Sequence, residues 1–265
     1  MRVALAITTH ERPDALAAVL ASVARLRMAP DEILVADDGS GHATRQVIDT
    51  FIARSAVPTR LVSQSHAGFR AARLRNLAIA ATSLDYIVFA DGDMVLHPEF
   101  IADHRRIARV GWYTQGVRVL VDQRRTQELL AGDSAPLSPL SRGLGVLRRL
   151  YLVHSPLLSS IARRLANRFI AIKSCNQGFW RADLLRVNGF DEEFVGWGPE
   201  DKELCARLEH AGVRRQTLLF GGIACHLHHE PAPRDRLPSL LERLAATRRE
   251  RRVRAEHGLD SHLRA

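Results

Sequence analysis

The sequence contains few cysteines and few aromatic residues. Its three cysteines form no CxxC pair, and only 6% of the 265 residues are Phe, Trp or Tyr. An odd, sparse set of thiols argues against a disulfide-stapled secreted scaffold and is typical of reduced cysteines in a cytoplasmic protein. We therefore expect an apolar core to hold the fold. The 46% of hydrophobic residues can supply that core in one large α/β domain.

Long apolar runs are also absent. No stretch reaches the roughly 18 uncharged apolar residues that a membrane-spanning helix needs. Residues 2–8 are apolar, but no charged head precedes them, so they indicate a strand rather than a secretory signal. The expectation is a cytoplasmic protein that is soluble, or that lies on the inner face of a membrane without crossing it.

The first half of the chain has no GxGxxG and no Walker-type glycine loop. A dinucleotide site or a P-loop site is therefore disfavoured. The net charge of +9 nevertheless indicates an anionic partner, such as a nucleotide, a phospholipid surface or a phosphorylated glycan. Nucleic acid is disfavoured, because the arginine-rich C-terminal run lacks the interleaved aromatics on which bases stack. If the partner carries phosphates, they must be neutralised without a glycine loop.

Strand-like and helix-like patterns alternate along the first 120 residues. Predicted strands cover 2–8, 32–36, 59–64, 86–90 and 112–121, and predicted helices cover 11–26, 43–54, 67–81 and 100–109. Short connections between them predict a doubly wound, mostly parallel α/β sheet.

Polar side chains follow three of these strands. Residues 8–10 are Thr-Thr-His, Asp37 and Asp38 follow the second strand, and Asp91-Gly92-Asp93 follows the fourth. In such sheets ligands bind at the carboxyl ends of the strands, so we expect these groups to converge. An Asp-x-Asp pair offers hard oxygen ligands to Mg²⁺ or Mn²⁺, which can bridge a diphosphate. A lone Asp-Gly-Asp is also a common turn, so its position after a strand is what favours the metal.

The stretch 194–204, FVGWGPEDKEL, is the centre of the predicted site. Glycines and a proline make a tight turn that exposes Trp197, whose flat indole can stack on a sugar ring. Glu200 and Asp201 follow at the start of a predicted helix. Acids open many helices because they interact favourably with the helix dipole, so the catalytic interpretation depends on the other motifs.

The second half resumes with a predicted strand that carries Asn176 and Gly178, a helix at 181–187 and a closing strand over 215–231. The closing strand brings in three histidines. We expect one of them to complete the metal site, with His226 favoured and His228 as the alternative. Zinc is disfavoured because no second Cys/His pair is spaced to complete a tetrahedron.

We expect residues 1–231 to form one domain, with a helical and loop-rich insert at about 124–173 and a basic helical tail at 232–265. The insert sets arginines beside apolar residues, which fits an interfacial surface for anionic lipid or the solvated face of a packed helical hairpin. These arginines are Arg148, Arg149, Arg163, Arg164 and Arg168. The tail similarly fits a solvated, partly frayed helix or an anionic-surface anchor.

The ordered motifs ITTHERP, VADDGS, GFRAARLRN, FADGD, NGFDEEFVGWGPED and HLHH resemble a family 2-type glycosyltransferase of the GT-A fold. The later block is similar to the C-terminal signature of chondroitin-polymerase-like enzymes and β-1,4-galactosyltransferases. The resemblance covers about 1–120 and 174–231, and leaves the insert and the tail uncovered.

The resemblance implies a role for each matching residue. Thr8, His10, Arg12, Asp37 or Asp38, Arg70 and Asp91 would bind the nucleotide; Asp93 and His226 would hold Mn²⁺ or Mg²⁺; Trp197, Gly178 and Glu200 would bind the sugars and acceptor; and Asp201 would be the general base. His10 departs from the aromatic residue that is common at its position.

The resemblance thus implies an inverting transfer of a sugar, from a nucleotide-sugar such as a UDP-sugar, to a hydroxyl of a glycan or lipid-linked glycan. A non-catalytic lipid- or nucleic-acid-binding protein on the same fold is the alternative, and metal-dependent UDP binding discriminates between the two. A nucleotidyltransferase is disfavoured, because that class usually has a glycine-rich loop after its first strand.

Overall fold

The computed structural model describes residues 1–132, 138–141, 144, 149–163, 165–168, 170–230 and 233–263. Arg148 and Arg164 of the predicted basic insert lie outside these ranges.

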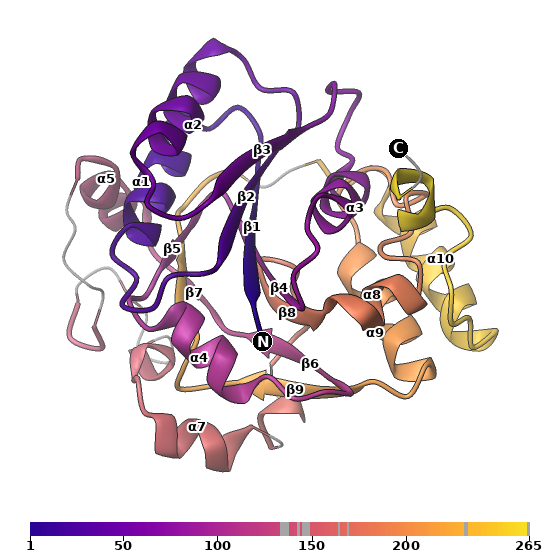
Figure 1. Cartoon of the computed structure of the whole chain (residues 1–265). Coiled ribbons are helices and arrows are strands. Elements are labelled where there is room, and N and C mark those ends of the chain that lie inside the picture. The colour runs from indigo at the N-terminus through magenta and orange to yellow at the C-terminus, as the bar shows by residue number, and fades with distance from the viewer. Residues whose placement is uncertain are drawn as a thin grey trace.

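A seven-stranded sheet in the order β3-β2-β1-β4-β8-β6-β9 forms the centre of the fold (Figure 1). The first four strands are parallel to one another, β8 runs antiparallel to both of its neighbours, and β9 is parallel to β6. The strands are β1 (Val3–Thr9), β2 (Glu32–Asp37), β3 (Thr59–Ser63), β4 (Tyr86–Asp91), β6 (Trp112–Gly116), β8 (Asn176–Trp180) and β9 (Arg214–Leu218). The predicted doubly wound, mostly parallel sheet is confirmed.

A second sheet of three short strands was not predicted. It pairs β10 (Ala224–His226) with β5 (Met94–Leu96) on one side and β7 (Arg118–Leu120) on the other. The predicted single strands over 112–121 and 215–231 are therefore wrong, because each is two strands in different sheets. The chain changes sheet at Gly116, where a Cβ atom would lie 2.1 Å from Asn176 Oδ1, and near Gly222, whose φ is +53°.

The helices cover both faces of the large sheet. They are α1 (Pro13–Val23), α2 (His42–Arg54), α3 (Ala71–Ala81), α4 (Phe100–Ile107), α5 (Gln123–Leu130), α7 (Pro156–Ala162), α8 (Arg181–Arg186), α9 (Glu200–His210) and α10 (Leu237–Arg249), with 3₁₀ turns η1 (Leu150–Leu152), η2 (Leu165–Arg168) and η3 (Leu259–His262). Helix α3 begins four residues later than predicted, because residues 67–70 form a loop in which Gly68 has a φ of +78°.

Alternate residues of β1 point to opposite faces of the sheet, as the period of two requires. Val3, Leu5 and Ile7 pack with α1, α2 and α4. Ala4 and Ala6 pack with α3, α8 and α9 on the other face. Figure 1 shows the two groups of helices on either side of the sheet. This two-sided core fixes the carboxyl ends of the central strands, where the site lies.

The C-terminal segment packs on the domain rather than fraying from it. Helix α10 buries Leu240 and Leu244 and lies against α9, and η3 lies against α3. The side chain of Leu259 is fully buried, and its backbone N–H donates to Asn188 O at 3.0 Å. The tail is therefore packed against the domain along one side of α10 and at η3, while the other side of α10 is exposed to solvent.

The described part of the insert contains α5, η1, α7 and η2, joined by turns and loops. Its outer side exposes several large apolar side chains, namely Leu150, Leu157, Leu158, Ile161 and Leu165. None of the described helices is both long and apolar enough to cross a bilayer.

Candidate active site

Strand register brings together the polar residues that end the central strands. Thr8 of β1 pairs with Asp91 of β4, and Thr9 of β1 pairs with Asp37 of β2. The hydroxyl of Thr8 donates to Asp91 Oδ1 at 2.9 Å. Gly92 allows the chain to turn here, because a Cβ atom on it would lie 2.9 Å from Thr9 Oγ1.

A buried arginine, Arg75 of α3, joins this edge of the sheet to the start of α9. Its guanidinium donates to Asp91 Oδ1 at 3.2 Å, Glu200 Oε1 at 2.9 Å and Ser174 Oγ at 3.0 Å. Its Cζ lies 5.5 Å from the centre of the Phe190 ring. The Arg75 guanidinium therefore binds two carboxylates at once, that of Asp91 in the DGD turn and that of Glu200 in the GWGPED stretch.

Glu200 and Asp201 occupy the first two positions of α9 and are both buried. The carboxylate of Asp201 accepts from the backbone N–H of Ser174 at 2.8 Å and of Lys202 at 2.7 Å. Burial and the neighbouring Asp201 charge raise the pKa of Glu200 to about 7, although Arg75 opposes this shift. Burial also raises the pKa of Asp201, against the effects of Arg75 and of the two N–H donors. This acid pair is held by fixed donors and is tuned toward neutral pH, as expected of acid–base groups.

Asp93 lies close to two histidines, His226 at the end of β10 and His229 three residues later. Its Oδ2 atom lies 3.4 Å from His226 Nε2 and 3.2 Å from His229 Nε2. Ligand atoms of these three residues lie within 4.8 Å of one another. Burial raises the pKa of Asp93, but the hydrogen bond with His229 and the His226 charge outweigh it and lower that pKa.

The histidine partners differ partly from the prediction. His226 reaches Asp93 as predicted, but His229 joins it in place of the predicted alternative, His228. His228 is exposed, and its backbone N–H donates to Thr126 Oγ1 at 2.8 Å. Strand β10 ends at His226, so the alternation of a strand no longer decides which of the next residues faces Asp93.

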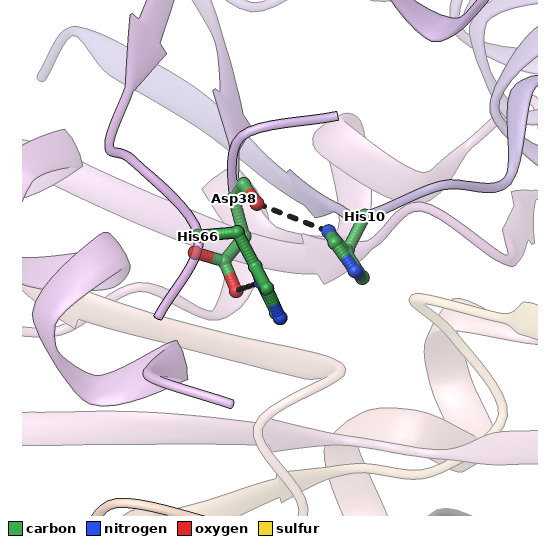
Figure 2. Close-up of side chains that lie close together, drawn as sticks. All are labelled: His10, Asp38 and His66. Atoms are coloured by element: carbon green, nitrogen blue, oxygen red, sulfur yellow. Dashed lines mark hydrogen bonds and ion pairs between the residues drawn. The ribbon is translucent and has the colours of Figure 1, made fainter. Parts of the chain in front are cut away.

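The turns after β1, β2 and β3 form a second cluster, shown in Figure 2. Asp38 is buried, and its carboxylate accepts from Gln64 Nε2 at 2.6 Å and contacts His66 Nδ1 at 3.0 Å. His10 Nδ1 lies 3.0 Å from the Asp38 carbonyl oxygen, and the rings of His10 and His66 stack with centres 4.2 Å apart. Asp37 accepts from the hydroxyl and the backbone N–H of Ser40 instead. Of the two aspartates, Asp38 is the one that contacts this histidine pair, His66 through its carboxylate and His10 through its carbonyl oxygen.

Arg12 and Arg70 flank these clusters. Arg12 lies close enough to Asp93 for its charge to lower the pKa of that carboxyl, and it pairs with Asp14 at 3.7 Å. Arg70 directly precedes α3, makes no side-chain capping hydrogen bond, and donates to the Ser65 carbonyl.

Trp197 is 38% exposed on the loop before α9. Gly178 is not brought to the site. It lies within β8, where a Cβ atom would be 2.3 Å from Tyr86 Oη, so we no longer assign it to acceptor binding. Its smallness serves the packing of Tyr86 inside the sheet.

Four residues of this arrangement were not singled out from the sequence as site residues: Arg75, Ser174, His66 and His229. The sequence marks Arg75 only as one of three arginines on a predicted helix, and Ser174 only as the residue before a predicted strand. Their roles depend on contacts with residues at least 16 positions away, which local patterns do not encode.

Comparison with known proteins identifies the family. A model described as glycosyl transferase family 2 matches residues 4–151, and one described as the N-terminal domain of galactosyltransferase matches residues 163–230. The first covers more than half of the chain, so the chain belongs to glycosyl transferase family 2. The resemblance seen in the motifs is confirmed.

Two curated relatives illustrate the range of the family. The chain is 28% identical over 218 residues to a validoxylamine A glucosyltransferase of Streptomyces hygroscopicus subsp. limoneus, covering 78% of this chain and 48% of that protein. It is 26% identical over 245 residues to a chondroitin synthase of Escherichia coli, covering 87% of this chain and 35% of that protein. The chain thus spans half or less of the length of these relatives.

Solved structures show the same GT-A fold. S. aureus TarS (residues 1–349) in complex with UDP superposes with a TM-score of 0.66 at 14% identity, covering 99% of this chain and 68% of that chain. Mycobacterium tuberculosis glucosyl-3-phosphoglycerate synthase, in complex with Mn²⁺, UDP and glucosyl-3-phosphoglycerate, superposes with a TM-score of 0.55 at 19% identity, covering 96% and 81%.

A cavity of about 740 Å³ lies elsewhere, between α1 and α2. Apolar side chains line most of it, and its described lining includes none of the predicted site residues. Cavity volume therefore does not identify the candidate active site in this protein. The converging charged groups identify it.

Proposed function

We propose that the chain transfers a sugar from a UDP-sugar to a hydroxyl of a glycan or glycolipid acceptor, with inversion at the anomeric carbon. Asp201 is the general base, Asp38 and His10 bind the nucleoside, and Asp91 faces the ribose. Family membership and the UDP-bound structures of similar fold support the donor class.

One observation carries this proposal: the chain of contacts from Thr8 through Asp91 and Arg75 to Glu200. It joins the strand ends proposed to bind the donor to the helix start proposed to activate the acceptor. Asp93 follows Asp91 by two residues, and Asp201 follows Glu200 by one. A donor and an acceptor bound to these residues would meet at one edge of the sheet.

The residues around Asp93 suit a divalent cation, and we propose Mn²⁺ or Mg²⁺. Asp93 Oδ1 is buried and has no hydrogen-bond partner among the described residues, while Oδ2 faces two imidazoles. A carboxylate with neutral imidazoles is a donor set that Mn²⁺ accepts. When bound, the cation neutralises charge that develops on the leaving diphosphate. Asp93, His226 and His229 would hold it.

The chemistry of the chain's own groups follows from their positions. An acceptor hydroxyl is a weak nucleophile, so the carboxylate of Asp201 takes its proton as the oxygen bonds to the anomeric carbon. The bond from that carbon to the diphosphate breaks on the opposite side, and its electron pair leaves with UDP. The N–H groups of Ser174 and Lys202 fix the Asp201 carboxylate, and Arg75 favours its ionised form.

We also propose that the insert holds the protein on an anionic membrane surface at its cytoplasmic face. Four large apolar side chains of α7 and η2 are between 43% and 72% exposed, and Arg163 lies between them in sequence. Apolar anchors beside arginine suit an interface with anionic lipid.

We expect the protein to sediment with phosphatidylglycerol vesicles but not with phosphatidylcholine vesicles. Leu157→Ser with Ile161→Ser should abolish it, and sedimentation unchanged in that variant would contradict the proposal.

The function is tested by UDP release from UDP-glucose, UDP-galactose, UDP-N-acetylglucosamine and UDP-glucuronate, with Mn²⁺ or EDTA. We expect release from at least one donor that requires Mn²⁺ and falls by about 10²–10⁴ in Asp201→Asn. Wild-type turnover in Asp201→Asn would show that the base is wrongly assigned. The anomeric configuration of the product, read by NMR, tests inversion.

A further inference from the structure

A cavity of about 360 Å³ lies where the loop before α9 meets the C-terminal segment. Three separate parts of the chain line it: His66 and Phe69 after β3, Trp197 before α9, and Asp235 and Arg236 before α10. Its volume falls in the range of small-molecule sites, roughly 300–1,000 Å³. Residues 233–236 lie beyond the family signatures, so no motif assigns them a role.

Two aromatic side chains are unusually open at this cavity. Phe69 is 42% exposed and Trp197 is 38% exposed. Large aromatics are usually mostly buried, and an exposed ring beside a pocket can stack on the C–H face of a pyranose. The backbone N–H of Gly196 donates to Phe69 O at 2.8 Å, so the two aromatic segments are tied together.

The C-terminal segment supplies the polar side of the cavity. Neither the Asp235 carboxylate nor the Arg236 guanidinium has an ion pair or side-chain hydrogen bond among the described residues. A carboxylate can accept from two neighbouring sugar hydroxyls, and a guanidinium can donate to hydroxyl or ring oxygens. Aromatic faces beside an acid and a base are the groups that sugar recognition uses.

The same segment fixes the loop that carries Trp197. Gly196 has a φ of +102°, and a Cβ atom on it would lie 3.3 Å from Arg236 Cδ. A Cβ atom on Gly198 would lie 2.5 Å from Leu240 Cδ1. On the indole itself, the Arg234 guanidinium lies 4.5 Å from the ring centre. The loop that leads into Glu200 and Asp201 is thus packed against residues 234–240.

We propose that this cavity is an acceptor subsite that binds a pyranose ring of the glycan acceptor. Phe69 and Trp197 stack on the ring, and Asp235 and Arg236 bind its hydroxyls. The C-terminal segment therefore determines acceptor specificity. This inference rests on the proposed glycosyl transfer, whose base follows Trp197 by four residues.

The probes are p-nitrophenyl β-glycosides of glucose, galactose, N-acetylglucosamine and glucuronic acid. Transfer is measured as the UDP released with the glycoside present, after subtraction of the UDP released by donor hydrolysis alone. Binding of the glycoside is measured separately by saturation-transfer NMR. The variants are Phe69→Ala and Asp235→Asn, with Asp49→Asn on the exposed side of α2 as the matched control. Full titrations separate the KM for the glycoside from the KM for the donor.

We expect at least one glycoside to bind, and each variant to raise the KM for that glycoside by about tenfold, a change worth about 1.4 kcal/mol. The donor KM, UDP affinity and donor hydrolysis should stay within about twofold, as in the control.

His66 also contacts Asp38, so a nucleobase is the competing occupant. A raised donor KM or weakened UDP binding in these variants would show that the cavity holds the nucleoside. No binding by any glycoside, or equal binding by wild type and both variants, would also overturn the proposal. If the wild-type protein did not hydrolyse any donor, that result would instead contradict the proposed function itself.

Discussion

Arg75 donates to Glu200 across 2.9 Å while only 3% exposed, and the same guanidinium reaches Asp91 at 3.2 Å. Arg75 belongs to α3, Glu200 to the start of α9 and Asp91 to the end of β4. In the sequence, Asp91 lies 16 positions from Arg75 and Glu200 lies 125 positions from it. A buried cation shared by two acids fixes the distance between their elements. Its charge also opposes the effect of burial, which favours the neutral form of Glu200.

Substitution of Arg75 should therefore change both stability and pH dependence. Arg75→Gln removes the partner of two acids, and breaking a buried pair costs about 3–5 kcal/mol, measured by denaturant unfolding. The Arg75 charge lowers the pKa values of Glu200 and Asp201. Without it both pKa values rise, so the base ionises only at higher pH. The acidic limb of kcat should move up by about one pH unit or more.

Arg75→Lys is the matched control, since it keeps the charge and loses the forked geometry. We expect a smaller displacement of the acidic limb than in Arg75→Gln. An acidic limb that stays in place in Arg75→Gln would show that Arg75 does not tune the base.

The two adjacent histidines His228 and His229 allow a matched comparison at the proposed metal site. His229→Ala should weaken the Mn²⁺-dependent part of UDP binding by about tenfold or more, because it removes a ligand next to Asp93. His228→Ala, whose side chain is exposed outside the cluster, should bind UDP like wild type. Fluorescence or calorimetric titration checks both, and the reverse order of effects would make His228 the ligand.

The C-terminal segment should contribute to stability. Leu259→Ala should lower the free energy of unfolding by about 2–5 kcal/mol, because the side chain is fully buried against α3. Leu263→Ala, at a site that is 42% exposed, should change it by about 0.5 kcal/mol or less. Equal stability of both variants in denaturant would indicate that η3 detaches from the domain in solution.

The sequence predicts β1, β2 and β4 because they are largely apolar runs of six or seven residues, separated by clear helix patterns. Asp93 and Asp201 could be selected because each belongs to a specific motif at the end of an element. The strands β5, β7 and β10 could not be predicted, since three residues are too short to show a period of two.

The contacts of Arg75 and His229 lay out of reach for another reason. Arg75 is one of three arginines on the helix predicted over 67–81, and only the fold determines which of them turns inward. The choice between His228 and His229 depends on the path of the chain after β10 ends. Neither is written in local sequence patterns, so the donor-side motifs could be predicted while the groups that connect them could not.

We propose that Asp93 and Asp201 act on one bound donor and have separate tasks. The most direct test is calorimetric titration of wild type, Asp201→Asn and Asp93→Ala with UDP in the presence of Mn²⁺. We expect Asp201→Asn to bind UDP within about twofold of wild type, and Asp93→Ala to lose about tenfold or more. UDP binding that survives in Asp93→Ala, or that is lost in Asp201→Asn, would contradict the account.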